Sequence, residues 1–225
     1  MPIPSAEGNI SSQSVKDIVY RKLKEWIIEG VLEPGEKISE KELAAYFNVS
    51  KTPVREAIQM LETQMLVKTY PRKETIVAPI KTDNIEEWYI PIIALEECAV
   101  REACKNVTEE ELKGLEELNA AIDRCSESED PLEIMRRDRA FHDEIVRIAN
   151  NRYISDFLEL LQMHIQRLEY MFFKNSRAGK KKYPQMHTRI IQAMRERNAD
   201  TAAALMKEHW LTSMEEIKDL LKNDE

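Results

Sequence analysis

The sequence is poor in glycine, aromatic residues and cysteine, and each shortage excludes a class of protein. Five glycines and 7% aromatic residues in a chain of 225, set against 33% charged residues, are typical of solvated helices and not of a sheet-rich fold. The three cysteines (Cys98, Cys104 and Cys125) are odd in number and lack the spacing of a metal site. We therefore expect free thiols in a reducing compartment.

Long apolar segments are also absent from the sequence. No apolar run approaches the roughly 18–20 residues that span a bilayer, so no membrane partner is expected. The first residues, MPIPSAEGNISSQS, have neither the basic start nor the apolar stretch of a signal peptide. We expect a cytoplasmic protein whose residues 1–12 form a disordered arm.

Charge is unevenly divided along the chain. The formal net charge of −8 is unfavourable for a protein that binds nucleic acid. However, residues 11–80 contain 11 basic and 10 acidic side chains, whereas residues 81–225 contain 22 and 30. The acidity belongs to the C-terminal two-thirds, which leaves the N-terminal third able to present a local basic face.

Residues 13–80 have the pattern of a winged helix-turn-helix domain. Two short helices are predicted on either side of the break NVS, the first opened by a capping box of Ser39 and Glu42, the second with Pro53 in its first turn. VKTY and TIVAPI are then predicted to form two strands around the charged tip PRKE. Two helices joined by a short break and followed by a two-stranded ribbon predict this DNA-binding fold.

The second of these helices, starting at Lys51, is the candidate recognition helix. Its outward side presents a cluster of hydrogen-bond donors at the N-terminal end: Ser50, Lys51, Thr52 and Arg55. Arginine matches a guanine edge, whereas lysine and hydroxyl groups mainly hold phosphates. A helical hairpin with a solvated charged face remains the alternative.

Residues 81–225 are predicted to be helical throughout and to form an effector-binding and dimerisation domain. The pattern predicts about six helices, near 83–105, 109–126, 131–149, 152–175, 181–197 and 200–222. Capping signals such as Thr108 with Glu111 support these starts. The expected fold class is therefore mainly α, a winged helix-turn-helix followed by a helical bundle that can enclose a ligand.

All four histidines lie in this bundle. Asp138 and His142 are four residues apart and share a helical face with apolar neighbours, where an unsatisfied polar pair is costly. Together with two of His164, His187 and His209, this pair predicts one metal site of nitrogen and oxygen ligands, suited to zinc, nickel, manganese or iron(II). The alternative is that each histidine is an ordinary core or surface residue.

The segment ISEKELAAYFNVSKTPVREAIQMLETQMLV resembles the N-terminal domain of GntR-family bacterial transcription regulators. The resemblance covers roughly residues 14–80. It implies contacts with DNA by Lys41, Ser50, Lys51, Thr52 and Arg55 and, from the wing tip in the minor groove, by Arg72. The family usually has arginine in place of Lys51 and glycine near Gln64-Met65 and at the wing tip, and glycine allows close backbone approach.

The segments DRAFHDEI and YPQMHTRIIQAMRERNADTAAALMKEHW resemble the all-helical FCD effector domain of the FadR-type branch of that family. The resemblance covers most of residues 82–222. It implies a metal held by Asp138, His142, His187 and His209, with positions left open for a small carboxylate metabolite. Such domains commonly sense organic acids in this way.

The effector pocket departs from the family pattern. These domains usually offer an inward arginine a turn before the Leu95-Glu96 pair, where this sequence has Pro91, Ile92 and Ile93. The remaining candidates to line the effector pocket are Arg167 and His164. The alternative is an arginine that reaches the surface and a histidine of the core.

The expected function is a DNA-binding transcription regulator, homodimeric on near-palindromic operator DNA. A small organic acid bound at the metal would change the relative pose of the DNA-binding domains and so release or tighten the operator. One alternative is a bundle that only dimerises, or that binds a non-carboxylate ligand without metal. A metal-dependent enzyme is less favoured, because no general base is evident beyond the ligand set.

Overall fold

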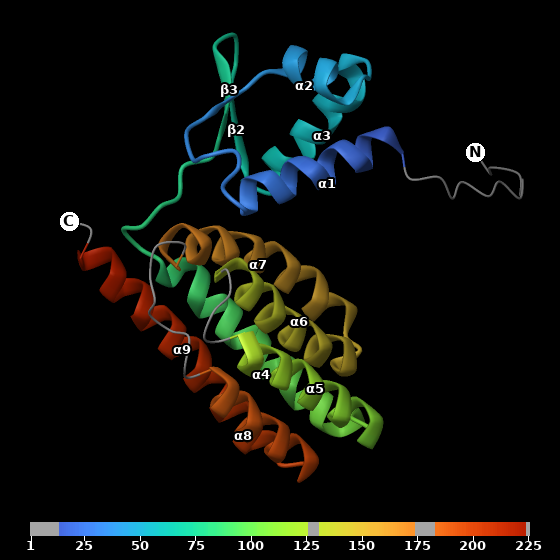
Figure 1. Cartoon of the computed structure of the whole chain (residues 1–225), viewed down its shortest axis with the longest axis vertical. Helices are drawn as coiled ribbons and strands as arrows, with labels where there is room; N and C mark the ends of the chain where they lie inside the picture. Colours follow the sequence, from blue (N-terminus) through green and yellow to red (C-terminus); the bar gives the residue numbers. More distant parts are fainter. Residues whose placement is uncertain (1–13, 126–130, 174–182, 224–225) are drawn as a thin grey trace, which may run out of the picture. The chain divides into compact units, whose positions relative to one another are not determined.

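Helices make up most of the computed structural model, which describes residues 14–125, 131–173 and 183–223 (Figure 1). Contacts divide the chain into two units, Met1–Ile27 with Val31–Pro79, and Ile28–Gly30 with Ile80–Glu225. The predicted disordered arm of residues 1–12 lies outside the described residues. Among the helices of the described ranges, none combines the length and apolar character that crossing a membrane requires.

The N-terminal unit is a winged helix-turn-helix. Its elements are α1 (Val15–Ile28), β1 (Lys37–Ile38), α2 (Glu40–Phe47), α3 (Lys51–Thr63), β2 (Val67–Tyr70) and β3 (Glu74–Val77). Ser39 caps α2 by accepting a hydrogen bond from the Glu42 amide, as the capping pattern predicts. Asn48 ends α2 in the left-handed region, at φ 53°, which asparagine tolerates better than most residues, and so turns the chain toward α3.

The predicted two-stranded ribbon is part of a three-stranded antiparallel sheet of order β1-β3-β2. The pairing sets Lys37 of β1 opposite Ile76 of β3, and Val67 of β2 opposite Val77 of β3. The prediction of two strands was therefore incomplete. A strand of two residues is too short to produce the alternating pattern from which strands are inferred.

Helices α1 and α3 and the sheet supply the hydrophobic core of this unit. Along each helix the buried positions recur every three or four residues, as a period of 3.6 residues requires. The buried side chains are Val19, Leu23, Ile27, Ile38, Ala44, Val54, Ala57, Ile58, Leu61, Leu66, Val67 and Val77. Because one face of α3 is buried, its opposite face stays in solvent together with the polar N-terminal end.

The C-terminal unit is a bundle of six helices within the described residues. They are α4 (Glu86–Asn106), α5 (Glu109–Cys125), α6 (Pro131–Ala149), α7 (Arg152–Phe173), α8 (Tyr183–Arg195) and α9 (Ala199–Asn223). Helix α4 packs against α6, α7 and α9, while α5 packs against α6 and α8 (Figure 1). These helices confirm the mainly α fold class. The sequence could predict it because periodicity and capping signals are local properties of a sequence.

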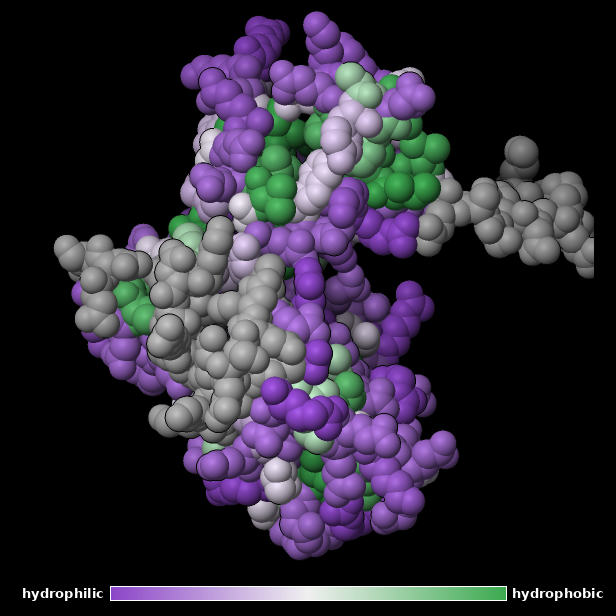
Figure 2. Space-filling model, viewed as in Figure 1, coloured by the Kyte–Doolittle hydropathy of each residue, from purple (hydrophilic) through white to green (hydrophobic). Residues whose placement is uncertain are grey.

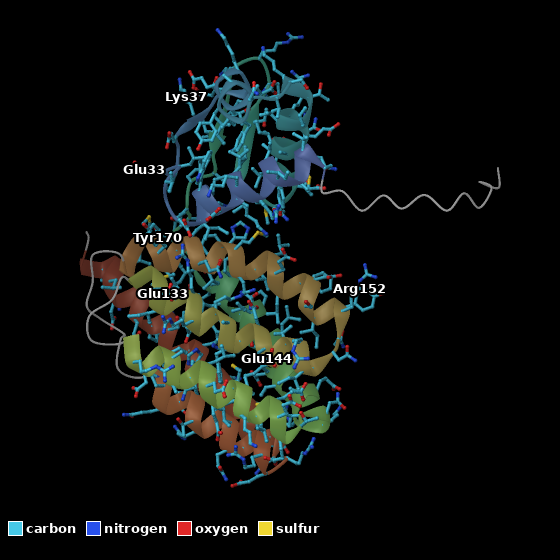
Figure 3. All side chains as sticks on the ribbon, turned by 45° about the vertical axis from the view of Figure 1, so that its right-hand side comes forward. Glu33, Lys37, Glu133, Glu144, Arg152 and Tyr170 are labelled. Carbon is cyan, nitrogen blue, oxygen red and sulfur yellow. The ribbon has the colours of Figure 1, made fainter. Side chains whose placement is uncertain are left out.

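Side chains fill the spaces between the helices of the bundle, whereas the labelled Arg152 at the start of α7 projects into solvent (Figure 3). Figure 2 shows hydrophilic side chains over most of the described surface in view. The bundle nevertheless buries several polar residues: Glu96, Asn119, His142, Gln162, His164, Arg167, His187, His209 and Ser213. Since a buried polar group is costly unless it is satisfied, these residues mark the candidate site.

Candidate metal centre and nucleic-acid interface

Four potential metal ligands converge from three helices of the bundle. Helix α6 supplies Asp138 and His142, α8 supplies His187 and α9 supplies His209, and one ligand atom of each lies within 4.8 Å of the others. The Nε2 atoms of His142 and His209 are 3.1 Å apart. The Nε2 atom of His187 lies 3.5 Å from Oδ1 of Asp138. Three imidazoles and one carboxylate therefore face a common centre.

The donor set and its spacing fit a transition metal ion. Ligand atoms about 2.1 Å from one ion lie roughly 3.0–3.4 Å from each other across tetrahedral or octahedral angles, which brackets the separation of the two Nε2 atoms. Oδ1 of Asp138 and Nε2 of His187 are both buried and have no hydrogen-bond partner among the described residues. Such orphaned atoms are rare in protein interiors, and a cation between them would satisfy both.

The outer ring nitrogens of two histidines face residues that sequence reasoning missed. Nδ1 of His187 lies 3.2 Å from Oδ1 of Asn119. The Asn119 amide nitrogen donates to the carbonyl oxygen of Pro184 and to Thr188 Oγ1. Its oxygen therefore faces His187, Nδ1 of that ring carries the proton, and Nε2 keeps a lone pair for the centre.

The carboxylate of Glu96 on α4 faces the outer ring nitrogen of His142 as a charge partner, and the two groups form no hydrogen bond. Oε2 of Glu96 lies 3.5 Å from Nδ1 of His142, and its Oε1 accepts a hydrogen bond of 3.2 Å from Nε2 of Gln162 on α7. Glu96 belongs to the Leu95-Glu96 pair, and a charged residue on an otherwise apolar face was the available signal in the sequence. Partners of this kind orient a metal-binding ring and raise its basicity.

The electrostatics of the centre follow from burial. Burial lowers the pKa of His187 and of His209 well below the ordinary value, so both rings are neutral at physiological pH. Burial also opposes charge on His142, but the carboxylates of Glu96 and Asp138 outweigh it and raise the pKa of His142. Burial, with the charge of Glu96, raises the pKa of Asp138. A cation would favour the ionised carboxylate and neutral rings that metal binding requires.

The two predicted effector contacts lie elsewhere on α7. Gln162 and Glu169, seven residues apart, both hydrogen-bond to inward-facing side chains of other helices. His164 is two residues beyond Gln162 and therefore about 200° further round the helix. Its ring stacks on Trp88 of α4, with 5.7 Å between centroids, and Arg167, three residues on, shares that side of α7. Contact of this pair with an effector stays a prediction.

The predicted DNA contacts of the helix-turn-helix are all exposed: Lys41, Ser50, Lys51, Thr52 and Arg55. Arg55 is held in place by Glu40 of α2, donating from Nε at 3.1 Å and from its terminal nitrogen at 2.8 Å. This pair lowers the pKa of Glu40. The hydroxyl of Ser50 makes no capping bond to the described backbone of α3. A pre-positioned guanidinium and an uncommitted hydroxyl suit a surface that contacts nucleic acid.

The wing tip places Arg72 in solvent between β2 and β3. The amide of Lys73 donates to the carbonyl oxygen of Tyr70, and Arg72 has a φ of 62°, as the third residue of a type II turn requires. Met65, after α3, has a φ of 59°. These are the two places where the family that the sequence resembles usually has glycine. The backbone therefore keeps the positive φ that glycine favours, although the side chains of Arg72 and Met65 make this conformation strained.

Comparisons with known proteins agree with both units. The family described as bacterial regulatory proteins, gntR family, matches residues 16–77, and the FCD domain matches residues 92–212. A Bacillus subtilis protein described as the uncharacterized HTH-type transcriptional regulator YdhC is 30% identical over 90% of this chain and 91% of its own. The HTH-type transcriptional repressor RspR of Escherichia coli is 28% identical over 93% and 91%.

Solved structures share the fold. The structure titled E. coli McbR/YncC matches with a TM-score of 0.82 over 92% of this chain and 99% of that chain, at 22% identity. A GntR-type putative transcriptional regulator from Rhodococcus sp. RHA1 matches with a TM-score of 0.76 at the same identity and over 92% of this chain and 99% of its own. The chain therefore belongs to the GntR family and carries an FCD domain: it is a DNA-binding transcriptional regulator and not an enzyme.

Proposed function

We propose that a small carboxylate metabolite, bound at a divalent transition metal inside the bundle, controls the affinity of this regulator for its operator. Asp138, His142, His187 and His209 would hold zinc, nickel, manganese or iron(II). The observation that carries the proposal is the convergence of these four ligand atoms, two of them buried without a hydrogen-bond partner among the described residues. When bound, the metal supplies a charge that attracts a carboxylate.

The DNA side of the proposal rests on the exposed end of α3. Arg55 would meet a guanine edge in the major groove, while Ser50, Lys51 and Thr52 hold phosphates beside the positive end of the helix. Lys41 would add a contact from α2, and Arg72 would reach the adjacent minor groove from the wing. All six side chains are exposed.

We propose a homodimer on near-palindromic DNA, so that two recognition helices enter successive major grooves. Helices α4 and α7 pack against each other and carry large exposed apolar side chains. The exposed fraction is 63% for Ile90, 74% for Tyr153 and 59% for Phe157. Exposed apolar side chains on packed helices are typical of association surfaces, so these helices are the proposed dimer contact.

The effector would act by shifting an equilibrium between two poses of the DNA-binding units. Operator affinity then changes only by the difference in effector affinity between the poses. The ring positions of His142 and His187 are coupled through Glu96 and Asn119 to α4 and α5. Movement at the metal can therefore be transmitted to other helices of the bundle.

Two measurements test the proposal. Protein purified without chelators should contain about one transition metal ion per chain by elemental analysis. A panel of organic acids should then raise the melting temperature of the metal-loaded protein more than that of the metal-free protein, because a ligand stabilises the state that binds it.

The opposite results point to the alternatives. Absence of metal, with no uptake of added metal, would leave a bundle that only dimerises or that binds a ligand without metal. Metal-dependent turnover of a metabolite at enzymatic rates would contradict a purely regulatory role.

A further inference from the structure

A second polar cluster lies inside the bundle and is not part of the metal ligand set. It consists of Tyr89 on α4, Glu169 on α7 and Ser213 on α9. Tyr89 and Ser213 are buried. The hydroxyl of Ser213 donates to Oε1 of Glu169 at 3.1 Å, and the hydroxyls of Tyr89 and Ser213 are 3.2 Å apart. A hydrogen-bonded polar network inside an apolar core is costly unless it is fully satisfied, so this cluster is a candidate for a functional role.

The cluster shares the inner helix faces that carry the metal centre. On α9, Ser213 follows His209 by four residues and so lies on the same face, one turn along. On α7, Glu169 follows Gln162 by seven residues, which is two turns on the same face. On α4, Tyr89 precedes Glu96, the residue that faces His142, by seven residues. At 1.5 Å per residue, the cluster lies roughly 6–10 Å along the bundle from the metal centre.

One carboxyl at the metal centre and one in the cluster both keep water-accessible surface. The side chain of Asp138 is 23% exposed although the side chain of His142 beside it is 2% exposed, and Glu169 is half-buried although its partner Ser213 is buried. Burial nevertheless raises the pKa of Glu169 to about 8. Glu169 therefore keeps accessible surface on the inner face of α7, which contact with a small ligand requires.

The direction of the hydrogen bonds within the cluster determines which kind of chemical group the cluster can bind. Because Ser213 donates to Glu169, its oxygen is left to accept from Tyr89, and the chain of donors runs Tyr89 to Ser213 to Glu169. The chain ends on a carboxyl group, which accepts hydrogen bonds when ionised. A cationic donor would offset the cost of ionising it, whereas a second carboxylate would be repelled.

We propose that Glu169, Ser213 and Tyr89 form the far end of the effector site, and that the effector carries a carboxylate at one end and an ammonium group at the other. The inference rests on the proposed function, because the metal is taken to bind the carboxylate.

A matched set of five-carbon probes tests this inference by isothermal titration of the zinc-loaded protein. The probes are 5-aminopentanoate, pentanoate and glutarate, whose length suits the interval between the metal and Glu169. We expect 5-aminopentanoate to bind about 10-fold or more tightly than pentanoate, as expected for a hydrogen bond to a charged group, and glutarate to bind more weakly than either.

Variants separate the two ends of the site. Glu169→Gln should remove the preference for 5-aminopentanoate over pentanoate. Glu159→Gln, an exposed glutamate on the same helix, should keep the preference. If Glu169→Gln does not fold, Ser213→Ala serves instead and should reduce the preference by roughly 3-fold, because it removes the neutral hydrogen bond that orients the carboxyl.

Two results would overturn the inference in distinguishable ways. If pentanoate or glutarate binds the wild-type protein as tightly as 5-aminopentanoate, or if Glu169→Gln keeps the preference, the far end is wrong while carboxylate sensing at the metal stands. If none of the three probes binds the zinc-loaded protein, both the inference and the carboxylate part of the proposed function fail.

Discussion

The two units hold their functional polar side chains in opposite surroundings. At the start of α3 the side chain of Arg55 is 59% exposed, whereas His142, His187 and His209 in the bundle are at most 3% exposed. DNA is a large partner with its charges on its surface, so the residues that contact it must project into solvent. A metal ion and a small ligand gain from neutral, desolvated and fixed donors.

The two units should respond differently to the loss of a polar side chain. A residue exposed at the DNA surface can be removed with little effect on folding, since it leaves no buried group unsatisfied. A polar residue of the bundle is held by partners from other helices, so its loss exposes those partners to an apolar interior. The contrast predicts separable phenotypes for the two units.

The largest expected effect is on metal content. His187→Ala should lower bound metal from about one ion per chain to almost none, because a tetrahedral or octahedral set loses one of its four protein ligands. Elemental analysis after dialysis without chelator measures this, and binding of operator DNA without effector should persist. His164→Ala is the matched control, since His164 is also a buried histidine of the bundle. Equal metal loss in both variants would contradict the assigned ligand set.

The next largest effect is on operator recognition. Arg55→Ala should weaken binding to a selected operator by about 1–3 kcal/mol, or roughly 5- to 150-fold, while binding to scrambled DNA changes little. Fluorescence anisotropy at one fixed salt concentration measures both affinities. Metal content should be unchanged. Arg152→Ala, an exposed arginine of the bundle, should leave both affinities as they are; retention of operator discrimination by Arg55→Ala would refute the docking.

A smaller effect is expected from the outer partner of His142. Glu96→Gln should weaken metal binding by about 10- to 100-fold, because the neutral amide orients the ring less strongly and lowers its basicity. Competition with a chelator of known affinity measures the change. Glu97→Gln is the control, since Glu97 is the next residue on α4 and faces Lys207 instead. Equal metal affinity in the two variants would show that Glu96 has only a packing role.

The smallest effect concerns the backbone of the N-terminal unit. Met65→Gly should stabilise this unit by up to roughly 1 kcal/mol, because glycine adopts a positive φ without steric cost, although it also gains entropy in the unfolded chain. Hydrogen exchange at amides of α3 and the sheet reports on this unit alone. Met65→Ala should bring no gain, and slower exchange in the alanine variant would assign the effect to the lost side chain instead.

Much of the fold could be inferred from the sequence, but less of the site. The helix bounds and the face of α3 that carries Arg55 follow from periodicity and capping. The alignment of Asp138 with His142 follows from their four-residue spacing. Strand β1 was missed because two residues have no period. Asn119 was missed because it approaches His187 across 68 positions in the chain, and nothing near Asn119 signals that partner.

The sequence by itself determined the two-unit organisation, the helical bundle and the donor-rich end of α3, since local spacing of apolar, capping and charged residues decides these features. The family resemblance implied Asp138, His142, His187 and His209 as metal ligands, but only the tertiary structure decided that one ligand atom of each lies within 4.8 Å of the others. Tertiary packing also decided that Glu96 and Asn119 turn the rings and that Glu169 meets Ser213. The physical reason is that helix packing, and not sequence separation, brings polar groups together inside an apolar core, where each must find a partner.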